Sequence, residues 1–219
     1  MAQLDGPRLD AASGTADSLV VLLHGYGADG NDLIALGQEW AQQLPDTAFA
    51  SPHAPMPLQM AGVGGRQWFE LTERNPAEYW RGVTEAAPLL NTFLDDELAR
   101  HGLSGDRLAL VGFSQGTMMA LHVGLRRATP LTAIVGYSGR LTGAEHLAAE
   151  LTGRPPVLLT HGDQDDLIPI DALHEARAAL AACDIPVEWH VSPGLGHGID
   201  AAGLQLGGDF MAKALARAS

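Results

Sequence analysis

The sequence has little of what crosslinks a chain or anchors it in a membrane. Its 219 residues include a single cysteine, Cys183, so an internal disulfide is impossible and an oxidising compartment is not required. No run approaches the ~18 apolar residues that span a bilayer, and the first ten residues lack the basic and apolar segments of a secretory signal. These absences predict a cytoplasmic protein without stable membrane insertion.

Basic residues are also scarce. Thirteen Lys and Arg stand against 26 Asp and Glu, which gives a formal net charge of −13. Such a field repels phosphate backbones, so we expect no nucleic-acid partner. A neutral acyl substrate remains compatible with this charge. Because the chain has no repeat, low-complexity tract or linker, residues 1–219 are predicted to form a single domain.

Short apolar runs alternate with segments of helical periodicity along most of the chain. Uninterrupted apolar strands are typical of a mostly parallel sheet with helices on both faces, the α/β class, in which ligands lie at the carboxyl ends of the strands. The strands are expected at residues 19–23, 108–111, 133–135, 157–159 and 187–191, and the helices at 31–44, 115–127, 171–182 and 204–217. Asn31 or Asp32 is the expected N-cap of the first helix.

The segment from about residue 51 to 80 lacks this rhythm. It contains four prolines together with methionines and large aromatic residues. A loop of this length in a compact domain usually forms a lid or a binding surface, and its apolar content favours a lid-like insertion. A variable surface insertion is the alternative.

The residues Gly112-Phe113-Ser114-Gln115-Gly116 match the pattern Gly-x-Ser-x-Gly between an expected strand and an expected helix. This context is that of a nucleophile elbow, in which glycines allow a sharp turn and the serine hydroxyl projects above the sheet. The motif predicts an α/β-hydrolase fold with Ser114 as the catalytic nucleophile.

A serine nucleophile needs a base and an acid, which follow it in the chain order Ser, Asp or Glu, His. His197 lies in a glycine-rich loop directly after the strand expected at 187–191, and is the predicted base. His161 precedes the candidate acids and therefore breaks this order. The acid is expected just after the strand at 157–159. There Asp165 is the first choice and Asp166 the second, while Asp163 is expected to accept hydrogen bonds from its own loop.

Two backbone amides must stabilise the oxyanion that forms during acyl transfer. The amide of Gln115, which follows the nucleophile, is one candidate. The amide of Tyr26, in the glycine-rich segment 24–27 after the first apolar strand, is the other. A plain glycine-rich turn is the alternative for that segment.

Flexible and aromatic side chains suit an acyl pocket. The candidate substrate-binding residues are Met56, Met60, Trp68, Met118 and Leu167. For Met118 a core position on the helix after the elbow is an equally good interpretation.

Three other functions are alternatives. A metallohydrolase could use His161 and the nearby aspartates, but no second His or Cys lies beside them at ligand spacing. A catalytically silent binding module would be expected to lack one member of the triad. A peptidase or lactonase would use the same triad, and fold alone does not choose between these activities.

Six segments resemble, in order, the phospholipase/carboxylesterase family that includes the acyl-protein thioesterases. They are 24–32 (HGYGADGND), 51–55 (SPHAP), 65–69 (GRQWF), 112–116 (GFSQG), 161–169 (HGDQDDLIP) and 196–197 (GH). The resemblance covers about residues 18–200. It implies a single α/β-hydrolase domain that needs no metal or cofactor. The implied activity is hydrolysis of carboxylic esters, thioesters or lysophospholipids.

The resemblance also implies residue roles. The family's triad maps onto Ser114, Asp165 and His197, and its oxyanion amides onto Tyr26 and Gln115. Residues 55–68 correspond to the border of the acyl pocket, and family members often form dimers, so a homodimer is a possible assembly. Tyr26 stands where the eukaryotic thioesterases tend to carry leucine. The chain therefore resembles bacterial carboxylesterases more than enzymes that remove palmitoyl groups from proteins.

Overall fold

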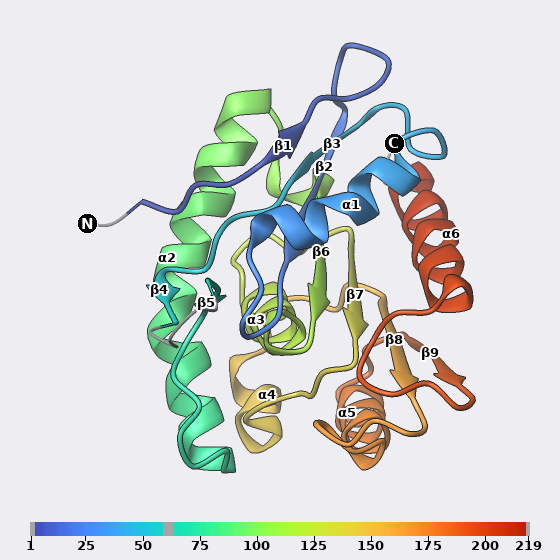
Figure 1. Ribbon diagram of the computed structural model, residues 1–219. Helices are drawn as coiled ribbons and strands as arrows, with labels where there is room; N and C mark the ends of the chain where they lie inside the picture. The colour runs from blue at the N-terminus through green and yellow to red at the C-terminus, as the bar shows by residue number, and fades with distance from the viewer. Residues whose placement is uncertain (1–2, 59–63, 218–219) are drawn as a thin grey trace.

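The computed structural model describes residues 3–58 and 64–217, which form a seven-stranded sheet between two layers of helices (Figure 1). The strands lie in the order β1-β3-β2-β6-β7-β8-β9; β1 is antiparallel to β3, and the other neighbours are parallel. The predicted mostly parallel sheet is thus confirmed. The bounds are β1 (Arg8–Leu9), β2 (Ser18–Leu23), β3 (Thr47–Ala50), β6 (Leu108–Phe113), β7 (Ala133–Tyr137), β8 (Val157–Gly162) and β9 (Val187–Ser192).

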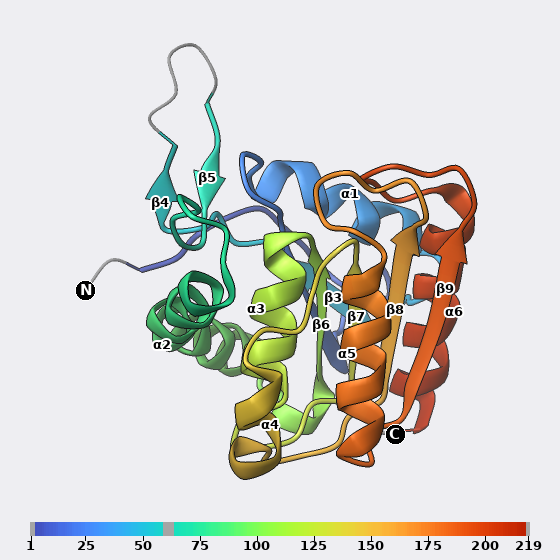
Figure 2. The same cartoon turned by 90° about the horizontal axis from the view of Figure 1, so that it is seen from below.

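Helices cover both faces of the sheet, as its uninterrupted apolar strands require (Figure 2). In β2, Val20 and Leu22 pack toward α1 and α6. The alternate residues of the strand, Leu19, Val21 and Leu23, pack toward the helices of the opposite face. One face carries α1 (Gly30–Trp40) and α6 (Ala201–Arg217). The other carries α2 (Pro76–His101), α3 (Gln115–Gly124), α4 (Ala144–Glu150) and α5 (Asp171–Ala182), and a short 3-10 helix, Gly105–Arg107, leads into β6.

Three predicted helices differ from the structure at their ends, and the last of them, expected at 204–217, begins at Ala201. The N-cap of α1 is Asp29, not Asn31 or Asp32, because the Asp29 carboxylate accepts the amide of Asn31 at 2.8 Å. That helix ends at Trp40, whose carbonyl accepts the amides of two residues in the following turn. The helix predicted at 115–127 ends at Gly124.

The predicted loop at 51–80 is shorter than expected and contains a small hairpin. Strands β4 (Met56–Pro57) and β5 (Arg66–Gln67) pair antiparallel and project from the body of the molecule near α2 (Figure 2). From Pro76 onward the chain is helical. Proline suits the first turn of a helix, and Asn75 caps it by accepting the Glu78 amide at 2.9 Å.

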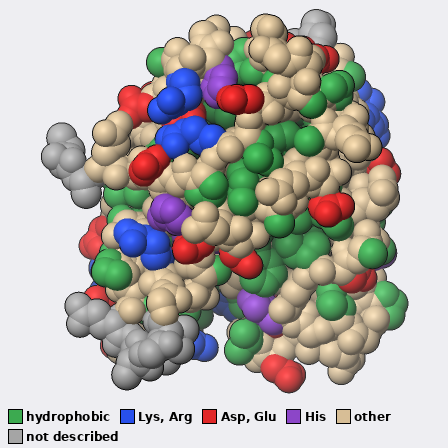
Figure 3. Space-filling view, turned by 45° about the horizontal axis from the view of Figure 1, so that its top comes forward, with side chains coloured by type: hydrophobic (Ala, Val, Ile, Leu, Met, Phe, Trp, Pro, Cys, Tyr) green, Lys and Arg blue, Asp and Glu red, His purple; other side chains and the backbone are tan. Residues whose placement is uncertain are grey.

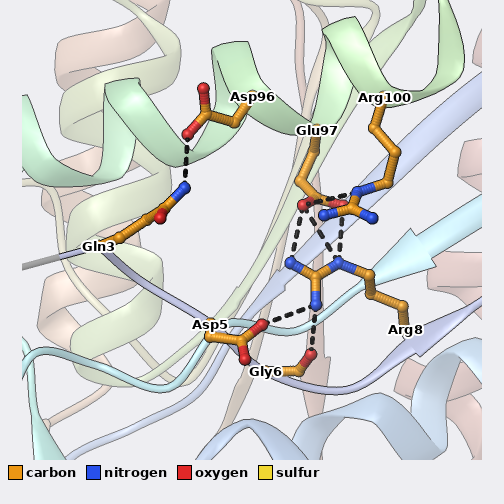
Figure 4. A network of polar contacts seen from close by, with 7 residues as sticks. All are labelled: Gln3, Asp5, Gly6, Arg8, Asp96, Glu97 and Arg100. Carbon is orange, nitrogen blue, oxygen red and sulfur yellow. Dashed lines mark hydrogen bonds and ion pairs between the residues drawn. The ribbon is translucent and has the colours of Figure 1, made fainter.

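The first strand is fastened to α2 by a network around a buried carboxylate (Figure 4). The side chain of Glu97 is only 1% exposed and accepts from Arg8 Nε at 2.9 Å and Nη2 at 2.8 Å. Arg100 Nε adds a contact at 3.3 Å. The buried carboxylate is therefore compensated by two guanidinium groups.

Acidic side chains are scattered over the face seen in Figure 3, with hydrophobic side chains between them. Among residues 3–58 and 64–217, no helix combines the length and the apolar character needed to cross a membrane.

Candidate active site

Ser114 lies in a strained turn between β6 and α3. Its backbone has φ 55° and ψ −114°, a conformation that residues with a side chain rarely adopt and that functional sites often retain. A Cβ at Gly112 would collide with the backbone of Gly116, and one at Gly116 would collide with the Leu23 carbonyl of β2. The two glycines therefore let the turn close against the neighbouring strand.

The hydroxyl of Ser114 is not used to cap the helix that it precedes. Its backbone is held instead, because the Ser114 amide donates to the Tyr137 carbonyl at 2.9 Å. The N-terminus of α3, with its partial positive charge, starts at the next residue.

His197 and Asp165 lie together at the carboxyl end of the sheet. His197 Nδ1 is 2.7 Å from Asp165 Oδ2, while Asp165 Oδ1 accepts the amides of Leu167 and Ile168, both at 2.9 Å. An ionised carboxylate only accepts hydrogen bonds, so Nδ1 carries the proton and Nε2 is free to act as a base. The Asp165 side chain is fully buried. It is thus fixed in both position and orientation.

The neighbouring polar residues take other places. Asp163 Oδ1 accepts a loop amide, but from Gly194 in the loop after β9 (2.6 Å) and not from its own loop, and Asp166 is exposed. His161, which the chain-order argument set aside, is buried with Nε2 2.7 Å from the Ile168 carbonyl and 3.3 Å from Asp165 Oδ2. Burial lowers the pKa of His161 and favours its neutral form. Across the described parts of the chain, no three His, Cys, Asp or Glu side chains are grouped to hold a metal ion.

Ser114 and His197 line the same pocket, whose volume is about 150 Å³. Tyr26 and Gln115 line it too, and the hydrogen bonds of the described residues include none donated by the amide of either residue. Two unused donors therefore lie beside the serine, as an oxyanion hole requires.

Two of the five predicted substrate-binding residues line this pocket, namely Met118 and Leu167. Leu167 is 63% exposed and so lies at the entrance. Met56 and Trp68 do not line it; they border a separate hollow, and the Trp68 side chain is buried in the core. Met60 lies outside the described residues.

Trp68 instead belongs to a polar network that sequence reasoning did not identify. Its indole Nε1 donates to the His24 carbonyl at 3.0 Å, and its amide donates to Gln115 Oε1 at 2.9 Å. The side-chain nitrogen Nε2 of Gln115 also donates to the Phe69 carbonyl at 2.8 Å. The side chain of Gln115 thus connects the elbow to residues 68–69, and Trp68 connects these to the segment that holds Tyr26.

The His24 ring supports the same segment. Its Nε2 accepts the Ala54 amide at 2.9 Å, so Nδ1 carries the proton and donates to the Gly25 carbonyl at 2.8 Å. Burial lowers the pKa of His24, which keeps the ring neutral and able to accept.

The structure adds pocket residues that the sequence did not single out. Phe113 packs its ring against His197, with centroids 4.9 Å apart. The others are Leu71, Arg74, Tyr79 and Ile168. In the sequence, only Phe113 and Ile168 could have been suspected, because each is adjacent to a predicted site residue.

Comparisons with known proteins identify the family and the fold of the chain. The model of the phospholipase/carboxylesterase family matches residues 4–215. Acyl-protein thioesterase 1 of Gibberella zeae is 26% identical over 209 residues, which cover 87% of this chain and 88% of that protein. The relative of the same name from Schizosaccharomyces pombe is 30% identical over 157 residues, covering 68% of this chain and 69% of that protein.

Solved structures are similar over nearly the whole chain. The crystal structure of esterase PE8 is 45% identical with a TM-score of 0.93, and the match covers 98% of this chain and all of that one. The carboxylesterase of Bacillus cereus, at 17% identity and a TM-score of 0.78 over 97% of this chain and 95% of that one, shares the fold. The predicted α/β-hydrolase fold is confirmed, as is the closer resemblance to bacterial esterases than to eukaryotic thioesterases.

Proposed function

The chain belongs to the phospholipase/carboxylesterase family and is a carboxylic ester hydrolase, and from this premise we propose that Ser114, His197 and Asp165 form its catalytic triad. The observation that carries the proposal is the 2.7 Å contact between His197 Nδ1 and Asp165, with His197 and Ser114 lining one pocket. Asp165 is preferred to Asp166 because Asp166 is exposed and makes no such contact.

The reaction follows from this arrangement. His197 Nε2 takes the hydroxyl proton as Ser114 Oγ attacks the acyl carbonyl carbon. The negative charge that forms on the carbonyl oxygen is stabilised by the amides of Tyr26 and Gln115. His197 then gives its proton to the departing alcohol or thiol. Water, deprotonated by His197, releases the acid from Ser114 and restores the enzyme.

The pocket size favours small esters as substrates. About 150 Å³ is below the roughly 300 Å³ at which pockets begin to enclose a drug-sized ligand. A palmitoyl chain would extend well outside it. Removal of palmitoyl from proteins is the second candidate, favoured by the fungal relatives named acyl-protein thioesterase 1. Thioester and lysophospholipid hydrolysis, a homodimer and a cytoplasmic location remain predictions.

The substitution Ser114→Ala tests the proposal. We expect loss of p-nitrophenyl acetate hydrolysis by roughly 10⁶-fold, the order measured for serine removal in other triads. Ser104→Ala is the control, since this exposed serine precedes β6 at the opposite end of the strand. A fluorophosphonate should label one serine in the wild type and none in Ser114→Ala. Retention of most activity by a folded Ser114→Ala protein would refute the assignment.

A further inference from the structure

The wall of the Ser114 pocket carries a cation. Among the residues that line this pocket, Arg74 is the one permanently charged side chain, and no Asp or Glu is among them. The hydrogen bonds and ion pairs of the described residues include none from the Arg74 guanidinium. Arg74 is exposed, so its guanidinium is open to an anionic group that enters the pocket shared with Ser114.

Arg74 is held in place by a buried carboxylate. Glu78 accepts three successive amides, those of Thr72 at 2.8 Å, Glu73 at 3.0 Å and Arg74 at 2.6 Å. The hydrogen bond from the Thr72 amide is the main reason why the pKa of Glu78 is lowered. These contacts maintain Arg74 at φ 52°, a left-handed conformation that is unfavourable for arginine. The turn that presents this side chain is therefore specifically stabilised by α2.

A second guanidinium lies behind the pocket wall. The Arg140 guanidinium carbon is 4.9 Å from the centroid of the Tyr79 ring, and Tyr79 lines the pocket. Arg140 Nε is buried without a hydrogen-bond partner among the described residues.

We propose that Arg74 binds a carboxylate carried by the substrate, so that the preferred substrates are short esters with a free carboxylate. The proposal rests on the triad function of Ser114, and it specifies the substrate class of that site. A guanidinium pairs with a carboxylate through two parallel hydrogen bonds, which suits a small anionic ester better than a long neutral chain. The limited pocket volume points to the same class.

Matched pairs of substrates separate the effect of the substrate's charge from the effect of its size. Methyl hydrogen succinate carries its carboxylate on the acyl part, and methyl succinamate replaces that carboxylate by a neutral amide of similar shape. Acetoxyacetate and acetoxyacetamide form the corresponding pair for the alcohol part. Hydrolysis is followed in a pH-stat at pH 7.5 and low ionic strength, and kcat/KM is compared within each pair.

Arg74→Gln removes the charge while keeping a Cβ and therefore the same backbone strain. Arg81→Gln is the matched control, because Arg81 is also exposed on this side of α2 but borders the separate hollow instead of the Ser114 pocket. Arg74→Lys keeps the charge without the paired geometry. Circular dichroism and fluorophosphonate labelling confirm that each variant is folded and has a reactive serine.

We expect the wild type to prefer the anionic ester of at least one pair by about tenfold, the order of a hydrogen bond to a charged group. Arg74→Gln should abolish this preference, because it should lower kcat/KM for the anionic ester about tenfold more than for the neutral amide. Arg81→Gln should keep the preference, Arg74→Lys should keep part of it, and 0.5 M salt should weaken it. Equal rates within both pairs in the wild type, or an unchanged preference in Arg74→Gln, would overturn the proposal while the triad function stands. If the wild type hydrolyses none of the four esters and does not hydrolyse p-nitrophenyl acetate either, the triad function is overturned and this inference with it.

Discussion

Replacing Trp68 by phenylalanine should lower catalysis although Trp68 does not line the Ser114 pocket. The change removes the indole N–H that donates to the His24 carbonyl at 3.0 Å. That carbonyl is buried, so losing its partner costs about 1–3 kcal/mol of stability. Gly25 and Tyr26 follow directly in the chain. The Tyr26 amide should therefore lose part of its fixed position.

The expected effect on activity follows from the oxyanion contribution. Complete removal of one oxyanion donor costs about 10²–10³ in kcat, so a displaced amide should cost about tenfold. The loss should fall mainly on kcat with KM nearly unchanged, because the donor acts on charge that appears in the transition state. Steady-state hydrolysis of p-nitrophenyl acetate measures both constants.

Trp40→Phe provides a matched control on the other face of the sheet. Trp40 is also buried, and its Nε1 donates to the Leu204 carbonyl at 3.1 Å. Both variants should unfold at lower urea concentration, and only Trp68→Phe should lose kcat. Equal kcat in the two folded variants would refute the positioning role. A change confined to KM or to acyl-chain preference would instead indicate that Trp68 contacts substrate, as the sequence first indicated.

Two further predictions concern stability. Burial, reinforced by Arg126, lowers the pKa of His122 to about 4 from 6.5, so the unfolded chain binds this proton first as the pH falls. The contribution of neutral His122 to the free energy of unfolding should therefore be fully present above pH 6.5 and fall by about 3 kcal/mol toward pH 4. In urea titrations, the free energy of unfolding of His122→Phe should decrease less between pH 7 and 4.5 than that of the wild type. Equal decreases in the two proteins would contradict this. Arg8→Met leaves the Glu97 carboxylate buried with a weaker partner and should destabilise by about 2–4 kcal/mol. Asp5→Asn removes only the contact of an 83% exposed side chain and should cost less than about 1 kcal/mol; equal costs in thermal unfolding would argue against the buried pair.

The sequence predicted best what depends on local pattern. The apolar strands and the Gly-x-Ser-x-Gly turn carry their own signals, since a covered parallel strand must be apolar and a sharp elbow requires small neighbours. The helix at Asp171–Ala182 agrees at both ends. No helix was predicted at α2: its first turn, with aromatic residues at 79 and 80, was interpreted as part of a loop, although Pro76 after Asn75 is a regular helix start.

What the sequence did not predict depends on tertiary contacts. Trp68 has the composition of a pocket residue, and only the fold shows that its indole faces the His24 carbonyl. His161 was set aside on chain order, which is a rule about roles and not about distance, and it lies 3.3 Å from Asp165 Oδ2. Arg74 gave no signal because the turn that contains it is formed by three backbone amides that Glu78 accepts.

The pairing of Leu23 with Gly112 has a consequence for how the enzyme acquires activity. These residues lie in the carboxyl-terminal parts of two neighbouring parallel strands, β2 and β6, which are separated in the chain by α1, β3, the hairpin and α2. Contacts of such large sequence separation form slowly because a long loop must close first, whereas α2 can form from local interactions. During refolding, helix content therefore reports early local order, and ester hydrolysis reports the completed centre of the sheet.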